Sequence, residues 1–305
     1  MNTEKDIIGS IGNTPLFKFT KIIDGLNGVT VYAKGEHLNP SGSVKDRAAR
    51  GIILGGIKSG KLTKEKIILD ATSGNTGISY AMIGAALGYK VTLCLPKNAS
   101  LERKSILRAY NAQIIETDPL QSSDGAQLAA EKLAEEEPEI YFYADQYNND
   151  ENWKAHYNTT ALEIWEQTNH KITHFIAGMG TSGTFTGTSR RLKELNPSIK
   201  IIAMQPDSPL HGLEGMKHMA TTILPGIYDP SIADGQIDVD TEDAQDMTLR
   251  LAREEGLFVG MSSGANVYAA LQLAATLPAG SLVVTILCDS GLRYLSDELW
   301  SRGHS

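Results

Sequence analysis

The first residue that suggests chemistry is a lysine in an unfavourable position. In the segment NPSGSVKDRAA (39–49), Lys45 follows a Pro-Ser-Gly-Ser turn and falls in the predicted first turn of a helix. Ser43 and Asp46 have the spacing of an N-cap and its reciprocal acid, which supports a helix start here. The N–H groups at a helix start carry partial positive charge, so they disfavour an ammonium group and lower the pKa of a partly desolvated amine. A neutral amine is suited to forming an imine with a carbonyl compound.

A turn rich in glycine and small hydroxyl residues, ATSGNTGIS (71–79), follows a predicted strand and leads into a predicted helix. In open α/β sheets, ligands bind at the turns that follow the carboxyl ends of the strands. Free backbone N–H groups and the helix dipole favour an anion there. We therefore expect this turn to receive a carboxylate, with hydroxyl groups contributed by Thr72, Ser73 and Thr76.

A second turn of this kind, GMGTSGTFTGTS (178–189), contains no acidic residue and is followed by two arginines. It predicts a phosphate site made by the backbone N–H groups of residues 180–184. The turn does not match GxxxxGK[ST], which disfavours a Walker-type nucleotide site, but it formally matches GxGxxG, which keeps a dinucleotide site open. The next predicted strand ends in Gln205 and Pro206, and only Asp207 is near the place expected for an acidic residue. Either turn alone is weak evidence, because glycine-rich turns are common.

A neutral lysine, a phosphate site and a carboxylate site form one chemically consistent set. Pyridoxal 5′-phosphate needs an uncharged amine to form an imine with its aldehyde and carries one phosphate, and an amino-acid substrate brings a carboxylate. The position of Lys45 is explained if this lysine holds the cofactor. Without the two turns, a surface lysine at a helix start would be the better interpretation.

The elements that must position these residues alternate between strand-like and helix-like patterns for most of the chain. The strand-like segments are 66–71, 90–96, 113–118, 172–180, 200–206 and 281–289. Such alternation predicts doubly wound, mainly parallel α/β sheets. Residues 141–153 are polar and rich in asparagine, which suggests a crossing between domains. Residues 206–240 form a long aperiodic stretch, either a functional lid or an elaborated surface connection.

The composition limits the partners and the location. Of 305 residues, 41% are apolar and 21% charged, so the chain can bury a core in one large domain or two. The net charge of −8 disfavours nucleic acid and anionic membranes as partners. The amino-terminal segment lacks the apolar stretch of a secretory signal, and the apolar runs are too short to span a bilayer. Cys94 and Cys288, both in predicted core strands, exclude a disulfide framework and a cysteine-rich metal site and fit a cytoplasmic protein.

Five segments, spread over nearly the whole chain, carry a family resemblance. They are NPSGSVKDRAA, TSGNTGIS, GMGTSGTFTGTSRRLKE, GMSSGANVYAAL and CDSGLRYLS. Together they resemble the cysteine synthases of the pyridoxal-phosphate β-family (fold type II), and the last segment is more similar to the B type than to the A type. The resemblance implies a homodimer of chains with two α/β domains and the cofactor between them. The smaller, mobile domain is expected at 37–149 with the carboxylate turn, and the larger at 1–36 and 150–305 with the phosphate turn.

The resemblance also assigns roles to individual residues. Lys45 is the lysine that forms the imine, Asn75 hydrogen-bonds the 3′-oxygen of the cofactor, and Ser262 meets the pyridine nitrogen. The substrate carboxylate is bound by Thr72, Ser73, Asn75, Thr76 and Gln146. The phosphate is held by Gly180, Thr181, Ser182, Gly183 and Thr184.

Two residues have structural alternatives that stay open. Ser262 is equally suited to be the N-cap of the helix predicted in GANVYAALQLAA. Cys288 is by default a small buried hydrophobic residue, whereas the resemblance places it in the lining of the cofactor pocket. No metal site is expected.

The expected reaction is β-replacement on O-acetyl-L-serine, with sulfide or thiosulfate as the sulfur donor, giving L-cysteine and acetate. A serine rather than a carboxylate at the pyridine nitrogen makes the cofactor ring a weaker electron sink. That favours concerted loss of the α-proton and the leaving group, with Lys45 as the general base.

Four other functions stay open. O-phosphoserine would need a cation for its leaving group, and the chain has no arginine between Lys200 and Arg250, although Lys217 offers a point charge unless it is simply a solvated loop residue. Cystathionine β-synthase is disfavoured because no haem segment or regulatory module is recognised. A serine or threonine dehydratase is disfavoured because the phosphate turn lacks a run of glycines. A non-catalytic amino-acid-binding module is disfavoured by Lys45.

Overall fold

The computed structural model describes residues 5–26, 28–72 and 74–302, and the chain divides into two compact units. The first unit comprises the chain up to Ile11, Asn39–Ser41 and Lys45–Ala155. The second comprises Gly12–Leu38, Gly42–Val44 and the chain from His156 onwards. The sequence-based domains placed residues 1–36 with the larger domain, whereas Ile8 and Ile11 pack in the hydrophobic core of the first unit.

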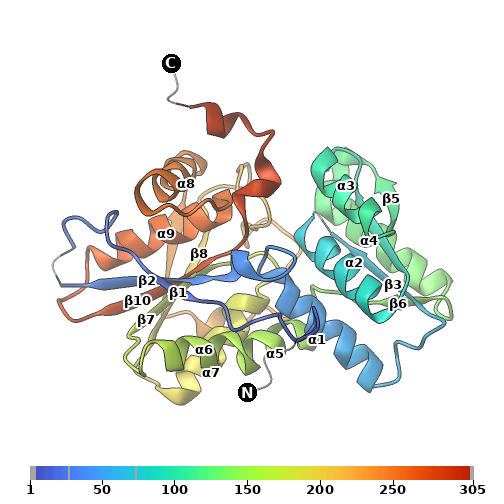
Figure 1. Ribbon diagram of the computed structural model, residues 1–305, viewed down its shortest axis with the longest axis horizontal. Coiled ribbons are helices and arrows are strands. Elements are labelled where there is room, and N and C mark those ends of the chain that lie inside the picture. Colours follow the sequence, from blue (N-terminus) through green and yellow to red (C-terminus); the bar gives the residue numbers. More distant parts are fainter. Residues whose placement is uncertain (1–4, 27, 73, 303–305) are drawn as a thin grey trace. The chain divides into compact units, whose positions relative to one another are not determined.

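The first unit is built on a four-stranded parallel sheet (Figure 1). In spatial order its strands are β5 (Gln113–Thr117), β4 (Val91–Pro96), β3 (Ile67–Ala71) and β6 (Tyr141–Tyr143). Its helices are α1 (Lys45–Lys58), α2 (Asn75–Leu87), α3 (Leu101–Ala109) and α4 (Ser122–Glu136), with the short η2 (Pro119–Gln121). Alternate residues of β3 face opposite sides, so Ile68 packs in a core shared with α1 and α2 and Leu69 in a core shared with α4.

The second unit is built on a six-stranded sheet that is parallel except at one edge. Its strands in spatial order are β1 (Leu16–Lys18), β2 (Thr30–Gly35), β10 (Leu282–Leu287), β7 (His174–Gly178), β8 (Lys200–Pro206) and β9 (Gly235–Val239), with β1 antiparallel to β2. Its helices are α6 (Thr160–Gln167), α7 (Gly183–Leu195), α8 (Thr241–Glu255) and α9 (Met261–Ala274). Val283 packs with α8 and α9 and Val284 with α6 and α7, so helices cover both faces of the sheet. Short 3₁₀ helices complete the unit: η1 (Glu36–Leu38), η3 (Pro230–Ile232), η4 (Gly291–Tyr294) and η5 (Glu298–Ser301).

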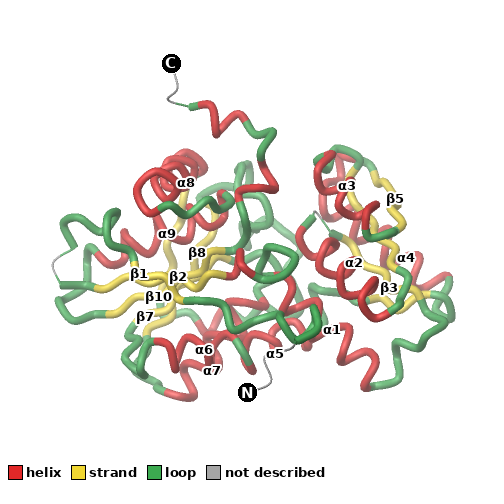
Figure 2. Tube along the Cα trace, in the orientation of Figure 1, coloured by secondary structure: helices red, strands yellow, loops and turns green. Residues whose placement is uncertain are grey.

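The predicted fold class is confirmed, because both sheets are doubly wound and mainly parallel. The two stretches that break the alternation contain more regular structure than expected. Residues 141–153 include β6 and the start of α5 (Asp150–Asn158), and the chain passes from the first unit to the second at Ala155 and His156. In the stretch 206–240, η3 and β9 lie in the last third, and residues 207–229 contain no helix or strand; Figure 2 draws such loop segments in green.

Among the described residues, no helix combines the length and apolar character needed to cross a membrane. The same residues contain no group of three or more His, Cys, Asp and Glu side chains arranged to hold a metal ion. Both cysteines are free. Cys94 is buried in β4, whereas Cys288 directly follows β10 and is partly exposed.

Candidate cofactor and substrate sites

Lys45 is the first residue of α1 and is partly exposed, as the predicted helix start requires. The turn before it is closed by Asp46, which is fully buried. The Asp46 carboxylate accepts a hydrogen bond from the backbone N–H of Ser41 at 2.7 Å, a second from the Ser41 hydroxyl, and a third from the hydroxyl of Ser79 at 2.5 Å. The spacing relates Asp46 to Ser43, and in the structure Asp46 also bonds Ser41, two residues earlier in the turn. These hydrogen bonds hold the start of α1 in place and therefore also the backbone of Lys45, its first residue.

The turn between β3 and α2, residues 71–77, is called the α2 turn here. Its helix has Gly74 as N-cap, with no side-chain capping bond and no acidic residue in the first turn. The Thr72 hydroxyl oxygen accepts from the backbone N–H groups of Gly74 and Gly77, at 3.0 and 3.2 Å, so its own proton is left for another acceptor. Asn75, the first residue of α2, is partly exposed. Ser73 lies outside the described residues.

Thr76 and Gln146, predicted to act on the same carboxylate, are in contact. The Thr76 hydroxyl donates to the Gln146 side-chain oxygen at 2.8 Å, and the Gln146 amide nitrogen donates to the Ala71 carbonyl at 2.6 Å. Both side chains are buried. The structure therefore brings the predicted carboxylate-binding residues Thr72, Thr76 and Gln146 to one place in the first unit.

Asp70 supports this arrangement, and the sequence interpretation missed it. One carboxylate oxygen accepts from the backbone N–H of Ala71 at 2.8 Å and the other from that of Gln146 at 3.3 Å. Complete burial, with a smaller contribution from the nearby Asp145 carboxylate, raises the Asp70 pKa to about 7. An acidic residue inside the otherwise apolar segment KIILDA is the signal that could have identified it.

The turn between β7 and α7, residues 178–184, is called the α7 turn. Ser182 adopts the left-handed conformation (φ 67°), α7 has no side-chain cap, and its first turn contains no acidic residue. The Gly183 N–H contacts the Thr181 hydroxyl oxygen at 3.4 Å. Because the first N–H groups of a helix have no acceptor within it, this uncapped start suits an anion. The residues present therefore fit a phosphate group.

The long loop 207–229 packs directly on the α7 turn. The Lys217 backbone N–H donates to the Met179 carbonyl at 2.9 Å, and a Cβ at position 180 would lie 2.1 Å from the Gly215 carbonyl oxygen. Glycine is therefore required at 180 for this close approach. The Lys217 ammonium donates to the Thr222 hydroxyl at 2.9 Å, so the side chain is partly buried and bonded within the loop.

The structure tests the interpretation of Ser262 as a helix cap. The N-cap of α9 is Gly260, and Ser262 is the second residue of the helix and largely buried. Its hydroxyl makes no hydrogen bond with any other residue that the structure describes. The N-cap interpretation is therefore wrong, and the hydroxyl is available to a ligand.

Cys288 is not a fully buried hydrophobic residue. Its backbone N–H donates to the Ser263 hydroxyl at 2.8 Å, and its sulfur accepts from the Asn266 amide at 3.2 Å. The same Asn266 side chain accepts from the Gly178 N–H at 2.7 Å and donates to the Ile286 carbonyl at 2.9 Å. Asn266, which sequence reasoning also missed, therefore ties the end of β7 and the end of β10 to α9.

Comparison with known proteins identifies the class. Residues 7–289 match the model of the family described as pyridoxal-phosphate dependent enzyme, and the chain belongs to that family. The chain is 48% identical to cysteine synthase of Aquifex aeolicus, over 97% of this chain and 92% of that protein. It is 42% identical to cysteine synthase B of Salmonella typhimurium, over 97% and 96% of the two chains.

A solved structure agrees with this relationship. The crystal structure of cysteine synthase from Entamoeba histolytica superposes with a TM-score of 0.93 at 35% sequence identity, over 98% of this chain and 91% of that one. Within the pyridoxal-phosphate dependent family, these similarities place the chain among the cysteine synthases. The expected family, fold and cofactor are therefore confirmed.

Proposed function

We propose that the protein converts O-acetyl-L-serine and sulfide into L-cysteine and acetate, with pyridoxal 5′-phosphate as cofactor. The observation that carries the proposal is the pair of uncapped, acid-free helix starts, α2 and α7, in a chain that has Lys45 at a third helix start. One helix start suits the carboxylate of an amino acid and the other the phosphate of the cofactor. Similarity to cysteine synthases over nearly the whole chain supports the choice of reaction.

The residues proposed to hold the cofactor are those predicted from the sequence. The phosphate would be bound by Gly180, Thr181, Ser182, Gly183 and Thr184. Lys45 would bond to the aldehyde carbon, Asn75 would bind the 3′-oxygen, and the unbonded Ser262 hydroxyl would meet the pyridine nitrogen. When bound, the cofactor supplies an acceptor for the electrons of the broken Cα–H bond.

The residues of the α2 turn are proposed to bind and orient the substrate. Thr72 can donate its unused proton to the carboxylate, and the N–H groups at the start of α2 add to the attraction. Thr76 and Gln146 can join them by exchanging their mutual hydrogen bond for bonds to the carboxylate. This orientation would present the α-proton to Lys45.

Lys45 is the proposed general base. Once the amino group of the substrate has replaced Lys45 at the aldehyde carbon, the freed Lys45 amine would accept the α-proton as the leaving group departs and would hold that proton until the sulfur nucleophile has added. Ser262 contributes a neutral hydroxyl, which stabilises a positive charge on the ring less than a carboxylate would. That difference favours departure of the leaving group together with the proton.

Several wider properties belong to the same proposal. The segment 37–149 is proposed to move when a carboxylate binds the α2 turn, and reduced hydrogen exchange around residues 72–76 with substrate would test this. We also propose a cytoplasmic homodimer, which acts on small molecules and binds neither nucleic acid nor membrane. The net charge of −8 supports the absence of nucleic-acid and membrane partners, and the two free cysteines support the cytoplasmic location.

The central experiment uses Lys45→Ala with Lys58→Ala, an exposed lysine at the other end of the same helix, as the control. The purified protein should be yellow, and borohydride should attach the cofactor to the peptide that contains Lys45. Lys45→Ala should lose cysteine formation while Lys58→Ala keeps it. Full activity in a colourless protein, or attachment to another lysine, would refute the proposal.

O-phosphoserine is a second candidate substrate, favoured by one observation. Lys217 lies in the loop whose backbone docks on the α7 turn, so a cation is held in the same unit as the proposed phosphate site. We favour O-acetylserine because lysine, unlike arginine, offers no bidentate contact to a phosphate. Comparing kcat/KM for the two esters decides between them.

A further inference from the structure

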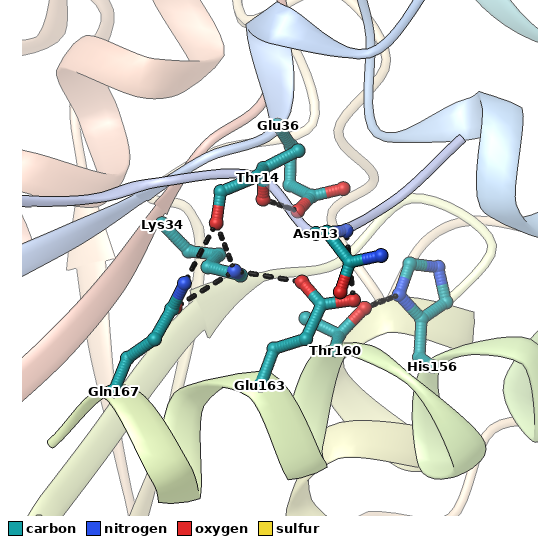
Figure 3. Close-up of polar contacts among 8 residues, drawn as sticks. All are labelled: Asn13, Thr14, Lys34, Glu36, His156, Thr160, Glu163 and Gln167. Carbon is teal, nitrogen blue, oxygen red and sulfur yellow. Dashed lines mark hydrogen bonds and ion pairs between the residues drawn. The ribbon is translucent and has the colours of Figure 1, made fainter. Parts of the chain in front are cut away.

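A buried polar cluster in the second unit holds α6 against the chain that precedes β1 (Figure 3). The Lys34 ammonium is fully buried and lies 2.7 Å from a Glu163 carboxylate oxygen. It also donates to the Gln167 side-chain oxygen at 2.8 Å and to the Thr14 carbonyl at 2.5 Å. The Asn13 N–H donates to the other Glu163 oxygen at 3.0 Å. Because breaking one member of such a cluster leaves a buried charge unpaired, α6 is held firmly in place.

At the start of α6, the side chains of Thr160 and His156 form a hydrogen bond outside this cluster. The hydroxyl of Thr160, the first residue of α6, lies 2.9 Å from Nδ1 of His156, as Figure 3 shows. Nε2 on the other side of the ring lies 3.3 Å from the hydroxyl of Thr184. Thr184 is the second residue of α7 and belongs to the α7 turn. His156 therefore connects a rigid helix start with the proposed phosphate site.

The burial of Thr160 determines the direction of these hydrogen bonds. Thr160 is 0% exposed and His156 1%, and within the described part of the chain the Thr160 hydroxyl has the His156 ring as its only side-chain partner. A buried hydroxyl proton without an acceptor is costly, so Thr160 donates to Nδ1. A neutral ring that accepts at Nδ1 carries its proton on Nε2 and donates it to Thr184.

This tautomer determines the orientation of the Thr184 hydroxyl, whose residue is partly exposed. Because its oxygen accepts from His156, its proton is left to point to another acceptor. In the opposite tautomer, Thr184 would donate to the ring and turn its lone pairs toward an incoming anion. The ring thus decides whether this hydroxyl attracts or repels a phosphate.

We propose that His156 is a positioning residue that holds the Thr184 hydroxyl as a hydrogen-bond donor to the phosphate of the cofactor. This inference rests on the proposed function, because it takes the α7 turn to be the phosphate site. His156 acts through Thr184 and does not contact the cofactor. Thr160 fixes the tautomer, and the cluster around Lys34 and Glu163 fixes Thr160.

The test compares two substitutions of His156. In His156→Gln, the amide nitrogen can take the place of Nε2 and still donate to Thr184, whereas in His156→Asn the amide reaches only the place of Nδ1. The affinity of the apoprotein is measured for pyridoxal 5′-phosphate and for pyridoxal, which lacks the phosphate. His156→Asn should weaken pyridoxal phosphate binding about tenfold, or about 1.4 kcal/mol, and leave pyridoxal binding unchanged. His156→Gln should retain most of the affinity.

A double-mutant cycle tests the path through Thr184. If His156 acts through that hydroxyl, His156→Asn should cause no additional loss of phosphate affinity in a Thr184→Val background. Equal weakening of pyridoxal and pyridoxal phosphate, equal effects of Asn and Gln, or a full additional loss in the double variant would overturn the inference.

A measurement on the unsubstituted protein does not depend on how the variants fold. Nitrogen-15 NMR of the His156 ring should show a proton on Nε2 and none on Nδ1 at neutral pH, and the opposite tautomer would refute the proposal. Failure of the proposed function has a different signature, because the wild-type protein would then not bind pyridoxal phosphate. In that case the tautomer, and the binding of inorganic phosphate by the wild type and by His156→Asn, still test the role of His156.

Discussion

The α2 and α7 turns are alike in composition but differ in what their hydroxyl groups already do. Both lead into a helix without a side-chain cap or an acidic first turn. In the α2 turn, the Thr72 oxygen occupies two backbone N–H groups, and the Thr76 proton is bonded to Gln146. In the α7 turn, the Thr184 hydroxyl oxygen accepts from the buried His156 ring, so its proton remains available to a ligand. Apart from the Thr72 proton, the first turn must exchange existing hydrogen bonds to bind an anion, whereas the second is prepared for one.

This difference suits two ligands with different residence times. A ligand at the α7 turn meets oriented donors and requires little rearrangement, which favours tight retention. A carboxylate at the α2 turn must first separate Thr76 from Gln146, so part of its binding energy is used to rearrange the turn. We expect a cofactor to remain at the first kind of site and a substrate to exchange at the second.

The largest effect should come from a negative charge in the α7 turn. Gly183→Asp should weaken pyridoxal phosphate binding by about 100-fold or more, because like charges placed together cost several kcal/mol. Gly183→Asn, similar in size and uncharged, is the matched control. Cofactor content from absorbance, measured for both variants, checks the prediction. Equal losses would show that crowding rather than charge is responsible.

Removing Gln146 should affect the α2 turn alone. Gln146→Ala should raise the KM for the amino-acid substrate about tenfold, with cofactor content unchanged, because a carboxylate partner is lost. Asn148→Ala, at an exposed position two residues further on, is the control. Steady-state kinetics and cofactor absorbance are measured together. Cofactor loss similar to that in Gly183→Asp would contradict the separation of the two turns.

Asp70, which supports the α2 turn, should make the unfolding free energy of the protein depend on pH. Its folded-state pKa of about 7 lies above the ordinary value of 3.8, so between these pH values the folded protein keeps a proton that the unfolded chain releases. The stabilising contribution is complete below the lower value and is lost as pH rises through about 7. Its size is on the order of a few kcal/mol, from 1.4 kcal/mol for each unit of pKa difference.

Asp70→Asn should therefore remove part of the decline in unfolding free energy between acidic and neutral pH. Urea unfolding at several pH values measures this decline, with Asp118→Asn at an exposed position as the control. An unchanged pH profile in Asp70→Asn would show that Asp70 is already ionised in the folded protein at acidic pH.

The smallest effect is expected at Lys217. Lys217→Ala should change kcat/KM for O-acetylserine by less than about threefold, because acetate carries less negative charge than phosphate and a single ion pair of a loop lysine contributes little. The same substitution should lower any activity with O-phosphoserine more strongly. Lys171→Ala, an exposed lysine of the same unit, is the control. A strong wild-type preference for O-phosphoserine that disappears with Lys217 would reverse the proposed choice of substrate.

The sequence predicts the elements that follow a simple pattern. The segments 66–71, 90–96 and 200–206 coincide within one residue with β3, β4 and β8, because buried parallel strands are continuous apolar runs. Strand β2 was not predicted, since TVYAKG contains a lysine that local pattern assigns to the surface. The structure buries Lys34 through partners more than one hundred residues away, Glu163 and Gln167, and no local signal contains that information.

The residues of the candidate site likewise separate into those that the local sequence reveals and those that it does not. Residues in glycine-rich turns, such as Thr72 and Thr184, are recognisable because turn composition and helix start coincide. Asp70, His156 and Asn266 were missed, because their roles depend on contacts that only the folded chain makes. Ser262 was ambiguous for a related reason: the start of α9 depends on Gly260, and a serine near a helix start has two plausible places.

The contact between Gly215 and Gly180 has a consequence for how relatives of this protein can diverge. A carbonyl oxygen that would lie 2.1 Å from a side chain at position 180 leaves no room for the loop to change its path at that point. Insertions or deletions between Pro206 and Gly215 would shift this register and disturb the α7 turn itself. Beyond Lys217 the loop is also attached to the sheet and to α7, since the Met219 N–H donates to the Gln205 side-chain oxygen at 3.3 Å and the Thr186 hydroxyl to the Ile227 carbonyl at 3.4 Å. We therefore expect related enzymes to keep the length of the loop between Pro206 and Gly215 and to differ in its side chains.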